Sequence, residues 1–393
     1  MNMDLLKKII TLFVVALPLI GVFAPRFFGF LPIIFSLIVC GEYFFHNKKL
    51  PNINKKLLSF VIIFLVFSGT SYFWAINPDF TLKRVLKLSI LVIPSLFLLF
   101  TAHSTQIFKA ETLRLLPYSV FSAAIILSIE TYFDYPLYRL VRNIPFDVTV
   151  APVVINWSLV ILSFLVWPAL YTLWSNKNKH LIAPLMISVS FAILTSTSQS
   201  AMVALVLGCI SLLISIKQPK VLLYGIGGTT IFGIFASPWL AQALFQLRPE
   251  IFINWTGASA AQRMELWDFV ARKALEKPWL GWGIEATRHI KDFDSAKIFY
   301  STTNIIHPHN FALQLWIELG LIGAISGALF IFLCTKNLLQ RPVKQLPFIT
   351  ACFTALIAVN LVGYGVWQGW FLGSQFITAF VFITLTKQDE TTS

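Results

Sequence analysis

Long apolar stretches with almost no charged residues follow one another along most of this chain. An α-helix needs about 20 apolar residues to cross the hydrocarbon core of a bilayer, and many of these stretches approach that length. The composition agrees, because 57% of the 393 residues are hydrophobic and 12% are charged, whereas about a quarter are charged in soluble domains. The chain is therefore expected to be an all-α, polytopic integral membrane protein, which excludes a soluble multidomain enzyme.

The apolar stretches predict about twelve transmembrane helices. Their approximate bounds are 9–24, 27–45, 57–75, 86–101, 115–132, 151–174, 181–197, 200–216, 221–238, 310–333, 345–366 and 370–385. Residues 1–238 would hold the first nine helices, residues 239–308 one long outer loop, and residues 309–393 the last three helices and a short tail. Within the loop, residues 259–277 have apolar side chains at helical spacing, and Ser259 is expected to cap a helix that ends before Pro278.

Lys and Arg residues are distributed unevenly between the loops. The net charge of +13 could indicate binding to nucleic acid, but cytoplasmic loops of membrane proteins also carry an excess of Lys and Arg. With the N-terminus in the cytoplasm, about sixteen of these residues fall in cytoplasmic segments and about six in short outer loops. This split predicts that both termini lie inside, and it explains the charge without nucleic acid.

Two of the six histidines flank a proline where the tenth predicted span begins, in the run His307-Pro308-His309-Asn310. Proline favours the first turn of a helix, so the helix is expected to start here, with free N–H groups facing the outer loop. Such a terminus attracts anions and disfavours a charged imidazole, which would keep His309 neutral and available as a base. The alternative interpretation is an interfacial histidine without a chemical role.

Polar residues continue along the same predicted helix. Asn310, Gln314 and Glu318 are spaced by four and therefore share one face. A carboxylate at the depth of Glu318 is expensive in a membrane and should face the protein interior. A structural hydrogen bond is the favoured interpretation, and a site or proton-path residue is the alternative. Gly320 and Gly323 are typical of close helix packing.

Several cations fall on the predicted outer side, where the distribution of charges disfavours them. They include Lys83, Arg84, Arg139, Arg263 and Arg288. Guanidinium groups match the geometry of phosphate oxygens. Together with a neutral histidine at the outer surface, these cations predict a site for a lipid-linked phosphate. For any single cation, contact with solvent or lipid headgroups is the alternative.

These residues resemble the O-antigen ligase family, which also includes O-antigen polymerases and some bacterial O-linked oligosaccharyltransferases. His309-Asn310, nine residues and then Gly320 and Gly323 are similar to the family pattern of His, a small polar residue, nine residues and Gly-x-x-Gly. A second similarity is Arg263, followed by Trp267 and by the run Pro278-x-x-Gly281-x-Gly283. The predicted spans and the long outer loop after span nine are also similar.

The resemblance implies a glycan on undecaprenyl diphosphate as donor and a sugar hydroxyl of lipid A–core as acceptor. Transfer would invert the anomeric centre, without metal or other cofactor, at the periplasmic face of the bacterial inner membrane. His309 would orient or deprotonate the acceptor, and Arg263 would stabilise the departing diphosphate. The other residues assigned to substrate binding are Arg288, Lys83, Arg84, Arg139, Gln199, His307 and Asn310, and the structural residues of the motif are Gly320, Gly323 and Glu318.

The sequence departs from the family at the predicted outer end of span eight. Many members carry an arginine there in a Ser-Arg-Gly-Ala-like stretch, whereas this chain has Ser198-Gln199-Ser200-Ala201. Gln199 can form hydrogen bonds but brings no charge, so diphosphate binding would depend on other cations.

Three other functions are compatible with parts of the pattern. An O-antigen polymerase often has two large outer loops, whereas here residues 134–149 form only a modest second one. An oligosaccharyltransferase usually has further periplasmic segments, which the sequence does not indicate. A transporter needs ionisable groups near the midplane, and the predicted spans are nearly free of charge apart from Glu318 and residues near span ends.

Overall fold

The computed structural model is a bundle of helices. It describes residues 3–105, 110–247, 258–290 and 306–392, and every regular element within these ranges is a helix. The expected all-α class is therefore confirmed for the described part of the chain. Of the expected outer loop, residues 248–257 and 291–305 lie outside the described residues.

The bounds of the helices agree with the apolar stretches of the sequence. The first group is α1 (Met3–Phe23), α2 (Leu31–Asn47), α3 (Lys55–Thr70), α4 (Pro78–Ser104), α5 (Ala110–Leu113), α6 (Leu116–Tyr132), α7 (Pro136–Arg142), α8 (Asn156–Ser175) and α9 (Ile182–Leu194). The second group is α10 (Gln199–Ser215), α11 (Pro219–Gln246), α13 (Ala258–Glu276), α14 (Phe311–Leu338), α15 (Leu346–Val362) and α16 (Gly369–Thr392). Short 3₁₀ turns η1 (Pro25–Gly29), η2 (Ser71–Phe73), η3 (Pro152–Ile155), η4 (Lys179–Leu181) and η5 (Ala286–Arg288) join them.

Local sequence signals set several of these ends. Asn54, Asn77 and Asn310 cap α3, α4 and α14, each accepting a hydrogen bond from the backbone N–H three residues later, as N-cap residues commonly do. Two helices have one end at a different residue from the one expected. α13 begins at Ala258, one residue before the expected cap, and α11 continues past residue 238 to Gln246, with Pro238 inside the helix.

The helices are those of a polytopic membrane protein. Among the described residues, six helices are long and apolar enough to cross a membrane, or seven if the pair α6 and α7, bent by 84°, counts as one span. Four more apolar segments, containing α2, α9, α10 and α15, are 10 to 17 residues long, which is short for the hydrocarbon core. Length and composition therefore support fewer spans than the twelve expected from the sequence.

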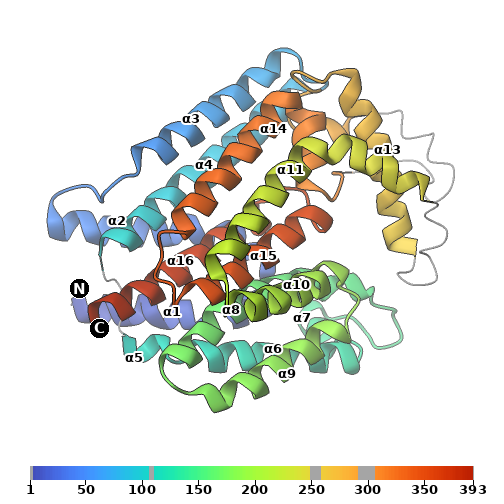
Figure 1. The fold of residues 1–393 in the computed structure, drawn as a ribbon. Helices are drawn as coiled ribbons and strands as arrows, with labels where there is room; N and C mark the ends of the chain where they lie inside the picture. Colours follow the sequence, from blue (N-terminus) through green and yellow to red (C-terminus); the bar gives the residue numbers. More distant parts are fainter. Residues whose placement is uncertain (1–2, 106–109, 248–257, 291–305, 393) are drawn as a thin grey trace.

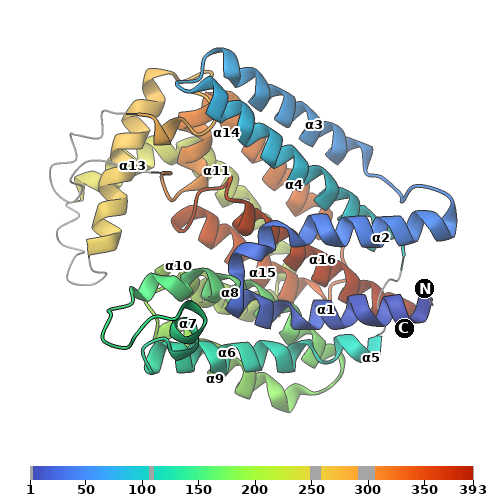
Figure 2. The ribbon, with the colours of Figure 1, turned by 180° about the vertical axis from the view of Figure 1, so that it is seen from behind.

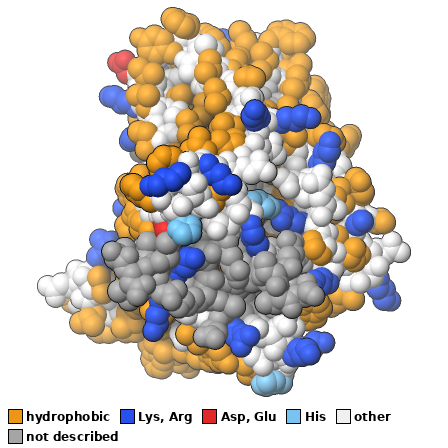
Figure 3. Space-filling model, turned by 90° about the vertical axis from the view of Figure 1, so that its left-hand side faces the viewer, with side chains coloured by type: hydrophobic (Ala, Val, Ile, Leu, Met, Phe, Trp, Pro, Cys, Tyr) orange, Lys and Arg blue, Asp and Glu red, His pale blue; other side chains and the backbone are white. Residues whose placement is uncertain are grey.

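Both chain termini lie at one end of the bundle, and α13 lies at the opposite end (Figures 1 and 2). The face on the side of the termini carries many Lys and Arg side chains and few acidic ones (Figure 3). This arrangement agrees with the expectation that both termini share one side of the membrane. Apolar side chains such as Ile63, Leu213 and Phe232 are more than 60% exposed on the outside of the bundle, which suits contact with lipid.

Two packed cores hold the helices together. The first surrounds α8, whose residues from Ser158 to Leu173 are all buried, and includes side chains from α1, α6, α9, α10, α15 and α16. The second surrounds the first half of α14 and includes side chains from α3, α4, α11 and α13. The predicted site residues come from elements of both cores.

α14 is interrupted by Gly320, whose backbone has φ 62° and ψ −150°. The segment after α13 fills the break, because Leu321 N–H donates to the Pro278 carbonyl over 2.7 Å and Gly283 N–H donates to the Glu318 carbonyl over 2.8 Å. Gly281 has φ +66°, and a Cβ there would lie 2.5 Å from the carbonyl carbon of Glu318. Glycine is required at such positions. The two glycine motifs of the sequence therefore dock against each other rather than against a neighbouring helix.

Candidate active site

His309 lies just before α14 and not inside its first turn. The helix begins at Phe311, and Asn310 caps it by accepting a hydrogen bond from Leu313 N–H over 3.1 Å. The expectation that Pro308 opens the helix was therefore wrong, because the asparagine takes the capping position. The Pro308 carbonyl instead accepts a hydrogen bond from the Trp267 indole over 2.8 Å, which anchors the segment to α13.

One hydrogen bond orients the ring of His309, and another joins its backbone to the ring of His307. Nδ1 of His309 forms a hydrogen bond with the Gly363 carbonyl, and its backbone N–H donates to Nδ1 of His307 over 3.3 Å. A carbonyl can only accept, so Nδ1 of His309 carries the proton and Nε2 keeps a lone pair. His309 thus has the arrangement of a general base, because Nδ1 is held by a hydrogen bond and Nε2 carries the lone pair.

Both histidines of the motif are neutral at pH 7. The pKa of His309 is lowered to about 4, mainly by burial; the Gly363 hydrogen bond acts in the opposite direction, and the nearby Arg263 contributes to the lowering. Burial also lowers the pKa of His307 to about 3, assisted by His309, Arg288 and Arg263. The expected neutral state therefore has a different main cause, which is burial rather than the helix terminus.

Arg263 reaches the site from α13 and contacts the residue at which the sequence departs from the family. Its Nη1 donates to Oε1 of Gln199, the first residue of α10, over 3.3 Å. The next residue, Ser200, forms a hydrogen bond with the hydroxyl of Tyr364, and burial raises the pKa of this tyrosine. Arg263, Gln199 and Tyr364 therefore lie together beside the two histidines.

Arg84 and Arg288 meet at a carboxylate that sequence reasoning missed. Glu285 is buried, and its two oxygens lie 2.5 Å from Nε of Arg84 and 2.5 Å from Nε of Arg288. Nη1 of Arg84 also donates to the Trp367 carbonyl over 3.0 Å. Glu285 closely follows the docked glycine segment and precedes Arg288 by three residues, a spacing at which opposite charges on a helical turn can pair.

The two remaining cations predicted for the site, Lys83 and Arg139, have other environments. Lys83 is exposed on α4. Arg139 is 2% exposed on α7 and is bound within its own loop, through Nε to the Asp134 carbonyl and through Nη1 to the carbonyls of Pro145 and Val148, at 2.6 to 2.8 Å. Its Nη2 pairs with the Asp134 carboxylate. These bonds hold together residues 134–148.

The loop between α15 and α16 is the second element that sequence reasoning missed. Its Gly363 carbonyl binds His309, and a Cβ at Gly365 would lie 2.8 Å from Cγ of His307. Backbone carbonyls leave no signal in a sequence, although the run Gly363-Tyr364-Gly365 hints at a tight approach. The loop packs directly against the histidine motif.

Gln314 and Glu318 point from α14 into the same loop. Oε1 of Gln314 accepts from Val366 N–H over 3.0 Å, and its Nε2 donates to Glu318 over 3.0 Å. Oε2 of Glu318 accepts from the Trp367 indole over 2.5 Å, and the Glu318 side chain is fully buried. The expected structural hydrogen bonds of Glu318 are present, and they reach a loop rather than another helix.

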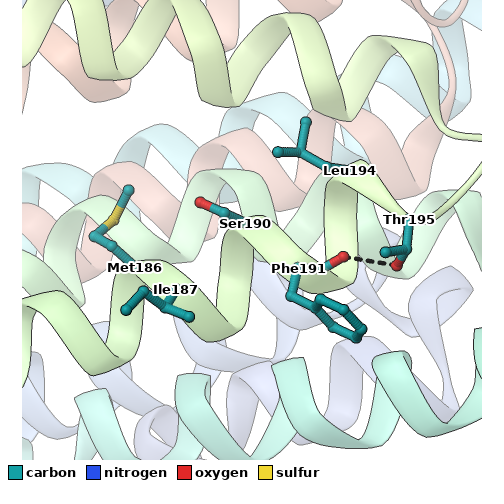
Figure 4. A pocket seen from close by; sticks show the side chains of 6 residues that line it. All are labelled: Met186, Ile187, Ser190, Phe191, Leu194 and Thr195. Carbon is teal, nitrogen blue, oxygen red and sulfur yellow. Dashed lines mark hydrogen bonds between the residues drawn. The ribbon is translucent and has the colours of Figure 1, made fainter.

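Among the described residues, neither a cluster of metal-binding side chains nor a surface depression found on α9 is part of this site. In the described ranges, no three His, Cys, Asp or Glu side chains are grouped as metal ligands would be. The depression is lined mostly by apolar side chains, with Ser190 and Thr195 as its polar members (Figure 4). Thr195 donates to the Phe191 carbonyl over 2.6 Å. No predicted site residue lines it.

Taken together, the fold and the histidine–arginine site define a polytopic membrane protein with a polar site at one end of its bundle. Residues 184–331 match the model of the O-antigen ligase family. This stretch runs from α9 into α14 and includes Gln199, Arg263 and His309. The chain therefore carries an O-antigen ligase family domain.

The protein is also similar to curated relatives with the name "Putative polysaccharide ligase". The protein from Rickettsia conorii is 29% identical over 237 residues, which cover 58% of this chain and 57% of the relative. The one from Rickettsia felis is 30% identical over 241 residues, which cover 58% of each. The chain thus spans less than two thirds of the relatives that it matches. No solved structure matches it significantly.

Proposed function

We propose that this chain is an O-antigen ligase of lipopolysaccharide assembly. It transfers a glycan from undecaprenyl diphosphate to a sugar hydroxyl of lipid A–core. The family domain and the similarity to polysaccharide ligases support the class of reaction. The basic face beside the chain termini, with the site at the other end of the bundle, supports a periplasmic site in a bacterial inner membrane (Figures 1 and 3).

The observation that carries the proposal is the orientation of His309. Because the Gly363 carbonyl holds Nδ1–H, Nε2 has the lone pair that a general base requires. In the proposed step, Nε2 takes the proton of the acceptor hydroxyl while its oxygen bonds to the anomeric carbon. The bond from that carbon to the diphosphate oxygen breaks on the opposite side, and the configuration inverts.

Cations near His309 are proposed to stabilise the charge of the leaving diphosphate. Arg263 is the first candidate, because it is close enough to lower the pKa of both histidines. Arg288 and Arg84 share Glu285, so this trio keeps one net positive charge. Preorganised cations in a partly buried site stabilise developing charge more strongly than cations in water. Gln199, His307, Asn310 and the exposed Lys83 remain proposed contacts of the substrate.

The test is complementation of a host in which the gene for this protein is deleted, with the wild type, His309→Ala or His180→Ala. His180 is an exposed histidine on η4 and serves as the matched control. The glycan is then separated into lipid A-linked and undecaprenyl-linked material. The proposal expects long glycan on undecaprenyl diphosphate with His309→Ala and normal ligation with His180→Ala.

Other outcomes would contradict the ligase. Chains that collapse to a single repeat unit would indicate a polymerase. Identical glycans from the wild type and His309→Ala, at equal protein levels in the membrane, would remove His309 from the reaction.

A further inference from the structure

We propose that Glu318 is a positioning residue for His309, acting through the loop between α15 and α16. The kinetic part of this inference rests on the proposed transferase function. Glu318 is fully buried and lies nine residues after His309, so it does not reach the reacting atoms. It acts by holding the segment that supplies the Gly363 carbonyl.

The hydrogen bonds of Glu318 use both carboxylate oxygens. Oε1 accepts from Nε2 of Gln314 over 3.0 Å, and Oε2 accepts from the Trp367 indole over 2.5 Å. The amide of Gln314 is thereby turned so that its oxygen accepts from Val366 N–H over 3.0 Å. Two successive residues of the loop are therefore fixed by one carboxylate, directly and through one amide.

The fixed residues lie close in sequence to the group that orients the histidine. Val366 follows Gly363 by three residues, and the intervening Gly365 has no room to shift toward His307. The position of the loop therefore sets the position of the Gly363 carbonyl. That carbonyl determines which ring nitrogen of His309 carries the proton. A buried carboxylate at this depth is costly, which favours a functional reason for its presence.

Three variants separate positioning from general packing. Glu318→Gln keeps one acceptor for the Trp367 indole but loses the second oxygen, and Glu318→Leu removes both. Trp367→Phe removes only the donor and keeps an aromatic ring beside Phe64, whose centroid is 6.0 Å away. Glu130→Gln is the control, because Glu130 is also buried and accepts backbone hydrogen bonds from Leu137 and Tyr138 in the first turn of α7.

The first measurement is the ¹⁵N spectrum of full-length protein with labelled histidines, in detergent or lipid. The His309 signals are identified from their loss in His309→Gln. We expect the Nδ1–H tautomer in the wild type and in Glu130→Gln. Glu318→Leu and Trp367→Phe should give a mixture or the Nε2–H tautomer, and Glu318→Gln should lie between them.

The second measurement is in vitro transfer. Misplacement of a catalytic group by about 1 Å can cost about a hundredfold in rate. We therefore expect kcat to fall roughly ten- to hundredfold in Glu318→Leu, with an unchanged KM for the lipid-linked donor. Glu130→Gln should keep the wild-type kcat.

An unchanged His309 tautomer in both Glu318→Leu and Trp367→Phe, in protein that is folded by thermal melting, would overturn the inference. So would an equal change in Glu130→Gln. The tautomer is read without substrate. If no variant and no wild-type protein transferred glycan, the proposed function would fail while the positioning of His309 would still be decided.

Discussion

Arg263 donates a hydrogen bond through Nη1 to Oε1 of Gln199 over 3.3 Å, which joins α13 to the first residue of α10. An arginine at the position of Gln199 could not accept this bond, because a guanidinium has only donors. The departure from the family pattern therefore gives Arg263 a neutral acceptor.

Replacing Gln199 by glutamate should weaken donor binding. In Gln199→Glu the carboxylate would pair with Arg263 and compete with the diphosphate, as a charge-assisted bond is about twice as strong as a neutral one. We expect the KM for the lipid-linked donor to rise about tenfold, with a smaller change in kcat. The measurement is in vitro transfer at several donor concentrations. Gln199→Leu, which removes the acceptor without adding charge, is the control and should change KM less than Gln199→Glu does.

The acid limb of the pH profile should lie well below the ordinary range of histidine. Only the neutral form of His309 can accept a proton, so the transfer rate increases as pH rises through its pKa. Burial lowers that pKa to about 4 from the usual 6.5. We therefore expect transfer to be nearly constant from pH 7 to pH 5.5 and to decline near pH 4. A half-maximal rate near pH 6.5 would show that the histidine is more hydrated than its burial indicates.

The docked glycines should be intolerant of alanine. Gly281 and Gly320 have φ of +66° and +62°, and a Cβ on either would lie 2.5 Å from backbone carbon atoms of the other segment. Left-handed backbone costs an L-residue about 1–2 kcal/mol, and forced contacts in a packed interior add about 1–3 kcal/mol. We expect Gly281→Ala and Gly320→Ala each to lower the melting temperature of the purified protein strongly.

A glycine without neighbours provides the comparison for these two variants. Gly225 lies exposed on α11, and a Cβ there would meet no atom within 4 Å. Alanine in the interior of a helix is favoured over glycine by about 0.5–1 kcal/mol. Gly225→Ala should therefore melt at the same or a slightly higher temperature. An equal loss in all three variants would contradict the docking.

Arg139 should matter for stability rather than for the diphosphate. Its guanidinium is occupied by the Asp134 side chain and by backbone carbonyls of its own loop. Removing a buried partner from such bonds costs about 1–3 kcal/mol. We expect Arg139→Ala to lower the melting temperature, while the donor KM of the remaining folded enzyme is unchanged. Arg142→Ala, three residues later on the exposed surface, should change neither, and a raised KM in Arg139→Ala alone would restore its assignment to substrate binding.

Much of the architecture could be predicted from the sequence, because the length of an apolar stretch is a local property. Each predicted span overlaps a helix, and the helix of residues 259–277 differs from α13 by one residue at each end. The number of spans was less predictable. The segments containing α2, α9, α10 and α15 are short for the membrane, and a run of apolar residues does not reveal where a helix stops.

The site was only partly predictable for a related reason. His309, Arg263 and Gln199 were recognised from residue type and spacing, and the structure brings Arg263 close to both. Arg84 and Arg139 were equivalent cations in the sequence, yet the first pairs with Glu285 beside the site and the second is bound within its own loop. Partners that lie far away in the chain decide between such roles.

The sequence by itself determined the membrane-spanning class, the positions of the helices and the histidine and arginine candidates, since these follow from residue type and local spacing. Only the tertiary structure decided which nitrogen of His309 is free. That choice depends on the Gly363 carbonyl, 54 residues away, and every residue carries a carbonyl. It also decided that Gly281 and Gly320 allow the segment after α13 to pack into a break in α14. Such a close approach between two backbones exists only once both segments are folded together.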